Sequence, residues 1–334
     1  NGVVTAAPPT FLSAPVSDIY IKLYASARPA FALLPSWLGP RRWRVAAVDL
    51  HKGTRVNVFA HGTTYYHFAN PAAEYDENFA KMRDMGLNVV RVAEIWPGWE
   101  VLEPEPGRFV FDDLDVYVRK AHAAGLGVVM GIGINNPPFW VFEDIADVRC
   151  VDVSGKVATR RVQSANHDNP EFREVMRRFI EAHVSHYASM PGIVAWQFGN
   201  EMRYGVETAD NECSRLRFRQ WLRQRFNGDL SALNAAWGVH YRRWEEIYPY
   251  ESREGAPTHG LAPLALASRQ FQAWSLEELL RWGVGLVKRH SPLPVFHNNM
   301  GMSGSCGSHW RLAEPCDLVV QDVYPTTSAN PQVY

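Results

Sequence analysis

The feature that most constrains this fold is an alternation, from residue 56 onward, of short β-rich runs and amphipathic helical stretches. The β-rich runs, several of them apolar at consecutive positions, are 56–66, 88–93, 127–134, 193–198, 294–297 and 318–323. The helical stretches between them are 75–85, 114–124, 171–189, 214–226 and 266–289. Strand and helix in repeated succession predict βαβ units and a parallel sheet buried on both faces.

A doubly wound sheet and a closed barrel both satisfy this alternation. The GxGxxG signature of a dinucleotide site is absent after the first run, and Gly131-Ile132-Gly133 is a lone GxG that no helix start follows. A chain of 334 residues suits one (β/α)8 barrel with additions. In such a barrel the functional side chains lie at the C-terminal ends of the strands.

Polar side chains stand at the ends of most of the predicted strands. They are Glu94, Asn135, Asn200, Glu201, Asn298, Asn299, Asp322 and Tyr324. The most abrupt change is at IVAWQFGNEM (193–202), where an apolar run ends in an amide beside a carboxylate. A Glu after a strand is most often a helix cap or a solvent-facing residue, but polar groups at several strand ends favour a site.

Composition and motifs argue against several classes of function. A net charge of −1 argues against a nucleic-acid partner, and no apolar run approaches the length of a membrane span. The four cysteines form no CxxC pair, and neither HExxH nor GxSxG occurs, so we expect no metal, no cofactor and no serine nucleophile. Paired carboxylates remain, and glycoside hydrolysis uses two of them.

At this point a resemblance becomes specific. The stretches that carry it are NVVRVAEIWPGWEVLEPEPGRFVFDDLD (88–115), PGIVAWQFGNEM (191–202), FRQWLRQRFNGDLSALNAAWG (218–238), PVFHNNMG (294–301) and DLVVQDVYP (317–325). In this order they resemble clan A of the glycoside hydrolases, and within it the family 42 β-galactosidases. The resemblance covers about residues 56–326 and implies a TIM barrel over 51–334. Residues 1–50 do not fit it, and we expect an irregular extension there with one short strand near 19–23.

The resemblance also implies roles for individual residues. Glu201 would be the general acid/base, and Asn200 would bond the sugar 2-hydroxyl. Arg91 would bind the sugar or hold the nucleophile, and Tyr324 would bond the nucleophilic carboxylate. Trp140 would line the substrate site. The alternatives are a structural salt bridge for Arg91 and core packing for the two aromatic residues. Two further cleft candidates are Glu94 and Trp96.

The sequence also departs from the family pattern. Only six strands are predicted, whereas the family's nucleophile is a Glu at the end of the seventh, so we expect strands seven and eight to lie beyond Tyr334. Asp322 and Glu94 do not occupy the expected place. We therefore expect a fragment with two open sheet edges, and as its partner either a homo-oligomer or a second chain that completes the barrel. The structural zinc that the family often carries is not expected, since only Cys150 and Cys213 fall in its region.

Other readings stay open. The substrate is expected to be a carbohydrate, but another clan A specificity, toward β-glucosides, mannosides or arabinosides, fits the same motifs. A barrel that kept sugar recognition and lost turnover is the non-enzymatic alternative. The absent nucleophile favours it, and the retained Asn200-Glu201 pair argues against it.

Overall fold

The computed structural model describes residues 48–49, 55–56, 60–152, 155–159, 164–203, 210–249, 262–300 and 308–323. Before residue 60 it describes β1 (Val48–Asp49) and β2 (Arg55–Val56), which pair antiparallel. The predicted strand near 19–23 lies outside the described residues, as does Tyr324.

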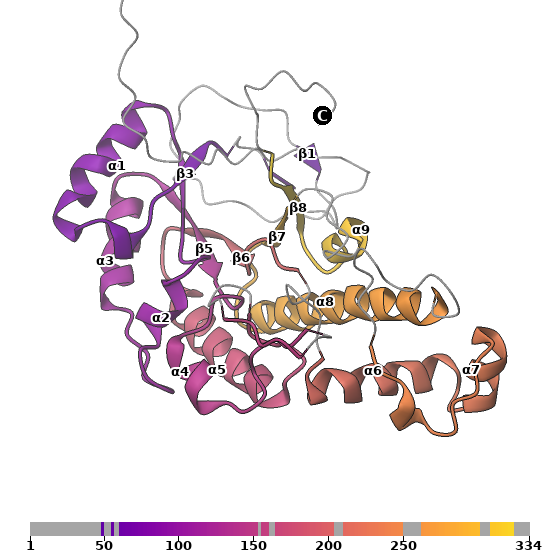
Figure 1. Cartoon of the computed structure of the whole chain (residues 1–334). Helices are drawn as coiled ribbons and strands as arrows, with labels where there is room; N and C mark the ends of the chain where they lie inside the picture. Colours follow the sequence, from indigo (N-terminus) through magenta and orange to yellow (C-terminus); the bar gives the residue numbers. More distant parts are fainter. Residues whose placement is uncertain are drawn as a thin grey trace, which may run out of the picture.

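A curled sheet of six parallel strands forms the centre of the described chain (Figure 1). The strands are β3 (Gly62–Thr64), β4 (Val89–Val92), β5 (Gly127–Ile132), β6 (Ile193–Phe198), β7 (Val295–Asn299) and β8 (Leu318–Gln321). They pair in sequence order, so β3 and β8 each have a single neighbour among the described strands. The six predicted strands and the parallel α/β half-barrel are thereby confirmed.

Helices follow most of the strands and cover the outside of the sheet. They are α1 (Tyr75–Asp84), α2 (Gly98–Leu102), α3 (Asp112–Ala123), α4 (Phe139–Asp144), α5 (Pro170–Tyr187), α6 (Glu212–Arg225), α7 (Leu230–Trp237), α8 (Ala262–His290) and α9 (His309–Ala313). Single 3-10 turns occupy His67–Ala69, Ala72–Glu74 and Trp244–Glu246. The five predicted helices are confirmed. The prediction missed α2, α4, α7 and α9, because five to eight residues are too few to display a helical period.

The start of α5 shows how the local sequence sets a boundary. The Asn169 side chain accepts hydrogen bonds from the backbone N–H groups of Glu171 and Phe172. Pro170 occupies the first helical position, where its missing N–H costs nothing. Replacing such a cap by Ala typically costs about 1 kcal/mol.

The two faces of the sheet bury different side chains, because successive strand residues point to opposite sides. Val90, Met130 and Trp196 point outward and pack under the helices in the main core. On the inner side, Ala195, Phe296 and Val320 form a separate apolar layer. Gln197, Asn298 and Asp322 each follow one of these three residues by two positions. They therefore lie on the same face of the sheet, nearer the C-terminal ends of the strands. The inside of the half-barrel therefore changes from apolar to polar toward the end where a site is expected.

The long helix α8 joins two hydrophobic cores. Its C-terminal half, from Leu276 to Val287, packs in the main core against the sheet. Its N-terminal half packs through Phe271 against α6 and α7, whose Phe218 and Leu233 belong to a smaller core. Figure 1 shows α6 and α7 set to one side of the sheet, next to α8.

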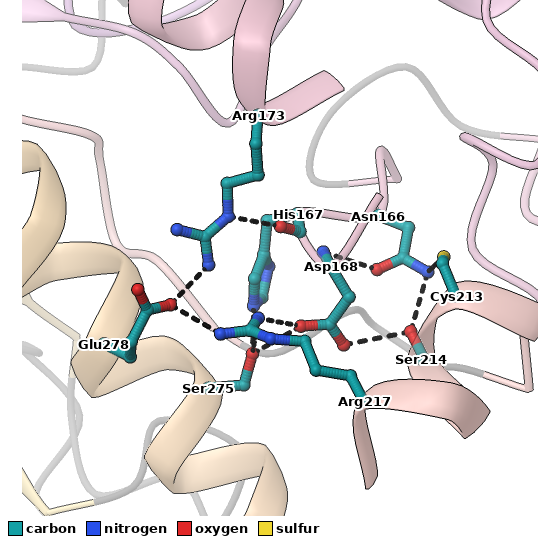
Figure 2. Close-up of polar contacts among 9 residues, drawn as sticks. All are labelled: Asn166, His167, Asp168, Arg173, Cys213, Ser214, Arg217, Ser275 and Glu278. Carbon is teal, nitrogen blue, oxygen red and sulfur yellow. Dashed lines mark hydrogen bonds and ion pairs between the residues drawn. The ribbon is translucent and has the colours of Figure 1, made fainter. Parts of the chain in front are cut away.

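A buried polar cluster ties α5, α6 and α8 to the loop before α5 (Figure 2). Asp168 on that loop has a fully buried side chain and pairs with Arg217 on α6. Glu278 on α8 accepts from both Arg217, at 2.6 Å, and Arg173 on α5, at 2.7 Å. Burial lowers the pKa of the adjacent His167 to about 4, so this ring is neutral at pH 7. Two guanidinium groups thus face two carboxylates in this cluster.

Candidate active site

The turn after β6 is held by side chains from the two neighbouring strands. The backbone N–H of Asn200 donates to Asn135 Oδ1 at 3.0 Å, and Asn135 Nδ2 donates back to the Asn200 carbonyl at 2.8 Å. The next N–H, of Glu201, donates to Asn298 Oδ1 at 3.2 Å, and that of Met202 donates to His297 Nε2 at 3.3 Å. Three successive peptide groups therefore have side-chain partners, which hold Glu201 at a φ of +45° that few non-glycine residues adopt.

His297 holds this turn as a neutral ring. Its Nδ1 lies 3.0 Å from the Phe198 carbonyl, which can only accept, while its Nε2 accepts from the Met202 N–H. One nitrogen must then carry a proton and the other must not. Burial lowers the pKa of His297 to about 4, which agrees with a neutral ring. Protonation would remove the acceptor that fixes Met202, next to Glu201.

Behind the turn, Gln197 on β6 joins the polar residues of the inner face. It is fully buried, and its Oε1 accepts from Arg91 Nη1 at 3.0 Å. Its Nε2 donates to Asn298 Oδ1 at 2.8 Å and to the Gly199 carbonyl at 3.0 Å. Asn298 Nδ2 in turn donates to Asn200 Oδ1 and to Asp322 Oδ2, each at 3.0 Å. The side chains of four strands or strand ends therefore meet in one hydrogen-bonded layer.

Arg91 lies between this layer and a buried carboxylate. Its Nε is 3.0 Å from Oε1 of Glu94, whose side chain is fully buried. The Tyr66 hydroxyl donates to the same oxygen at 2.6 Å. Burial first, and then the Glu94 charge, raise the pKa of Tyr66 far above its usual value, so it stays a donor. Arg91 thus makes a structural ion pair and also contacts the polar layer.

The lone GxG of the sequence has a packing role. A Cβ on Gly131 would lie 2.3 Å from the Glu94 backbone nitrogen, and one on Gly133 would lie 3.1 Å from the Ala93 carbonyl oxygen. Ala93 itself has a φ of +72°. The two glycines therefore leave the space in which the segment after β4 crosses β5 and brings Glu94 to Arg91.

Two carboxyl groups adjoin at the C-terminal ends of the strands. Burial, followed by a hydrogen bond with the Glu201 carboxyl and the charge of that group, raises the pKa of Asp322 to about 7. The positive charge of Arg91 and the hydrogen bond from Asn298 act in the opposite direction. Near neutral pH the Asp322 carboxyl is therefore partly protonated beside Glu201, and paired carboxyl groups with shifted pKa values are typical of sites for acid–base chemistry.

The structure brings together Arg91, Asn200 and Glu201 of the predicted site residues, linked through Gln197 and Asn298. Trp140 on α4 packs against the main core, and its indole donates to the Glu103 carbonyl at 3.0 Å. Its role in substrate binding stays a prediction. Trp96, a further cleft candidate, is partly exposed and donates to Glu100. Tyr324 cannot be placed, because it lies outside the described residues.

Gln197 and His297 were not among the predicted site residues. Gln197 was hidden in a run read as apolar, although a single amide inside a buried strand is a signal in itself, because a buried amide needs partners. His297 lies inside a predicted strand, and the sequence does not show which backbone groups its ring would contact. Among the described residues, no three His, Cys, Asp or Glu side chains gather closely enough to hold a metal ion. No described helix has the length and apolar character needed to cross a bilayer.

Comparison with known proteins gives a consistent assignment. The sequence profile of glycoside hydrolase family 42, described as beta-galactosidase, matches residues 64–333. The beta-galactosidase BgaA of a Thermus species is 33% identical over 278 residues, which are 79% of this chain and 41% of that protein. The beta-galactosidase of Thermus thermophilus is 32% identical, with the same two coverages.

Solved structures agree with the sequence relatives. The beta-galactosidase of the haloarchaeon Halorubrum lacusprofundi superposes with a TM-score of 0.72 at 30% identity, over 79% of this chain and 40% of that one. That of Marinomonas ef1 gives 0.70 at 27% identity, with the same coverages. The chain thus spans about two fifths of the length of these relatives. With a profile match over most of its length and the fold of these barrels, the chain belongs to glycoside hydrolase family 42.

Proposed function

We propose that this chain carries the acid/base half of a retaining β-galactosidase site, with Glu201 as the general acid and base. The observation that carries the proposal is the side-chain-held turn that presents Glu201 beside the Asp322 carboxyl, at the C-terminal ends of the strands. Family membership supports glycoside hydrolysis, and the beta-galactosidase names of the relatives support a β-galactoside as substrate.

In the proposed mechanism, Glu201 protonates the glycosidic oxygen as the leaving group departs. It then removes a proton from the water that releases the sugar. The proton taken from that water restores the acid form of Glu201, and the raised pKa of Asp322 limits the negative charge beside Glu201 near neutral pH. Asn200 binds the sugar 2-hydroxyl, and Arg91 holds the inner side of the site in place.

A retaining mechanism needs a second carboxylate about 5–5.5 Å from the first, as the nucleophile. Glu94 is a poor candidate, because it is fully buried and engaged by Tyr66 and Arg91. Asp322 is hydrogen-bonded to Glu201 itself, which is too close for a sugar to lie between them. We propose that the nucleophile comes from a seventh strand that is not among the described residues. That strand would belong to a longer polypeptide or to a second chain.

The acid/base role can be tested with Glu201→Gln in an enzyme that carries all eight strands. Hydrolysis of galactosides with poor leaving groups should slow by about 10²–10⁴-fold, whereas activated aryl galactosides should be affected far less. The exposed Glu105→Gln is the matched control and should change neither rate. Equal losses on both substrate classes would assign Glu201 a structural role.

The proposed position of the nucleophile has its own test. Residues 1–334 alone should not turn over an aryl β-galactoside, and a polypeptide that supplies the remaining strands should restore activity. Robust turnover with retained anomeric configuration by 1–334 alone would instead make Asp322 the nucleophile. Faster turnover of aryl β-glucosides, mannosides or arabinosides than of galactosides would favour another clan A specificity. Sugar binding without turnover by the complete enzyme would favour a binding protein.

A further inference from the structure

Three side-chain amides in the site contact one another, and their orientations depend on one another. We name Gln197, Asn298 and Asn200 the amide chain. An amide has a donor end and an acceptor end of nearly the same shape, so its hydrogen-bond partners decide which end faces which way. A partner that can only donate, or only accept, therefore fixes the direction of an amide next to it.

Arg91 fixes the first member. A guanidinium has donors and no acceptor, so the atom of Gln197 that faces Arg91 Nη1 at 3.0 Å must be Oε1. The other end, Nε2, then faces three acceptors, namely the Gly199 carbonyl at 3.0 Å, Asn298 Oδ1 at 2.8 Å and Asn200 Oδ1 at 3.3 Å. Since a carbonyl can only accept, Gly199 requires the same orientation of Gln197 independently.

Asn298 is fixed by two neighbours that agree. Its Oδ1 accepts from Gln197 Nε2 and from the backbone N–H of Glu201. Its Nδ2 must then be the donor to Asp322 Oδ2 and to Asn200 Oδ1, each at 3.0 Å. Gln197 and Asn298 are both almost wholly buried, so water does not compete for these positions.

The orientation of the third amide, Asn200, follows from the orientations of the other two. Asn200 Oδ1 is held by donors from both Gln197 and Asn298, which places its Nδ2 on the opposite side of the amide group. We propose that Gln197 and Asn298 are positioning residues, which make Asn200 a donor toward the sugar and seat the turn that carries Glu201. This inference rests on the proposed function only for the identity of the ligand, because the orientation of the amides is a property of the free protein.

Two isosteric variants break the amide chain at single atoms. Gln197→Glu keeps the side-chain volume and the acceptor that faces Arg91, but places an oxygen opposite the three acceptors. Asn298→Asp keeps the acceptor for Gln197 and for the Glu201 N–H, but loses both donated hydrogen bonds. Gln220→Glu makes the same chemical change at an exposed position on α6 and is the matched control.

The first measurement is the affinity of the full chain for galactose and for 2-deoxygalactose, titrated by NMR. The unmodified protein should prefer galactose by roughly 2- to 10-fold, the factor expected for one neutral hydrogen bond. Both amide variants should lose this preference while still binding the two sugars about equally, and Gln220→Glu should keep it. If Gln197 and Asn298 were merely structural, their replacement would weaken the binding of both sugars by the same factor. A preference for galactose that is retained in both amide variants would therefore overturn the proposal.

The second measurement needs no ligand. The side-chain NH2 resonances of Asn200 should shift clearly in Gln197→Glu and Asn298→Asp, and not in Gln220→Glu. If the unmodified protein binds neither sugar, the proposed function fails. The amide chain is then still judged by these resonances, and unchanged Asn200 signals in both variants would refute it. If neither variant folds, the rate at which the Asn298 NH2 protons of the unmodified protein exchange with solvent tests the amide chain. The proposal requires slow exchange, and fast exchange would refute it.

Discussion

Removing the Asp168 carboxylate should destabilise the protein strongly, because it leaves two largely buried guanidinium groups facing a single carboxylate. The Asp168 side chain is fully buried and accepts from Ser214 Oγ at 2.9 Å, from Ser275 Oγ at 2.6 Å and from the Arg217 guanidinium. In Asp168→Ala, Arg173 and Arg217 face Glu278 alone, and the neutral His167 adds no compensating charge. Breaking a buried pair on one side costs about 3–5 kcal/mol.

The expected loss can be measured by thermal and urea unfolding of the purified chain. At about 2 °C per kcal/mol for a protein of this size, the melting temperature should fall by roughly 6–10 °C. Asp76→Ala removes an aspartate from the exposed Lys120 pair and serves as the control, with an expected cost of about 0–1 kcal/mol.

A second variant tests the charge argument itself. Asp168→Ala combined with Arg217→Met leaves one guanidinium, Arg173, facing one carboxylate, Glu278, so the charges balance again. The double variant should therefore be more stable than Asp168→Ala by at least about 1 kcal/mol, since removing both members of a buried pair is often close to neutral. A cost below about 1 kcal/mol for Asp168→Ala, or additive losses in the double variant, would refute the reasoning.

Two further predictions concern the site. The pKa of Asp322 is about 7 in the folded protein and near 3.8 when unfolded, so its protonated form favours the folded state, and this stabilisation is lost as the pH rises from about 4 through 7. Asp322→Asn should not lose stability in this way. Its urea midpoint should therefore rise relative to that of the unmodified protein as the pH increases from about 4 to 7. A difference in midpoint that stays constant over this range would contradict the shifted pKa. Gly131→Ala places a Cβ against the Glu94 backbone and should displace Glu94 from Arg91, which a crystal structure of the variant would show. Gly285→Ala, where a Cβ meets no neighbouring atom, should leave that ion pair in place.

Much of the architecture could be predicted from the sequence. The apolar runs of the strands and the period of 3.6 in the helices are local, so the six strands and the five longer helices follow from short windows of residues. The change from Trp196 to Asn200-Glu201 marks a strand end with polar groups, and Glu94 follows its own strand in the same way. Short helices such as α4 and α9 escaped prediction, because one turn and a half shows no period.

The sequence by itself determined that this chain alternates strands and helices in βα units and that the strands end in polar side chains, because those properties depend on neighbours a few residues away. Only the tertiary structure decided which polar groups meet. Arg91 and Gln197 are 106 residues apart, and Gln197 and Asn298 are 101 apart. The neutral state of His297, the raised pKa of Asp322 and the space left by Gly131 likewise arise from groups on other strands. Such contacts leave no local period, because burial and hydrogen-bond direction are set where distant segments pack together.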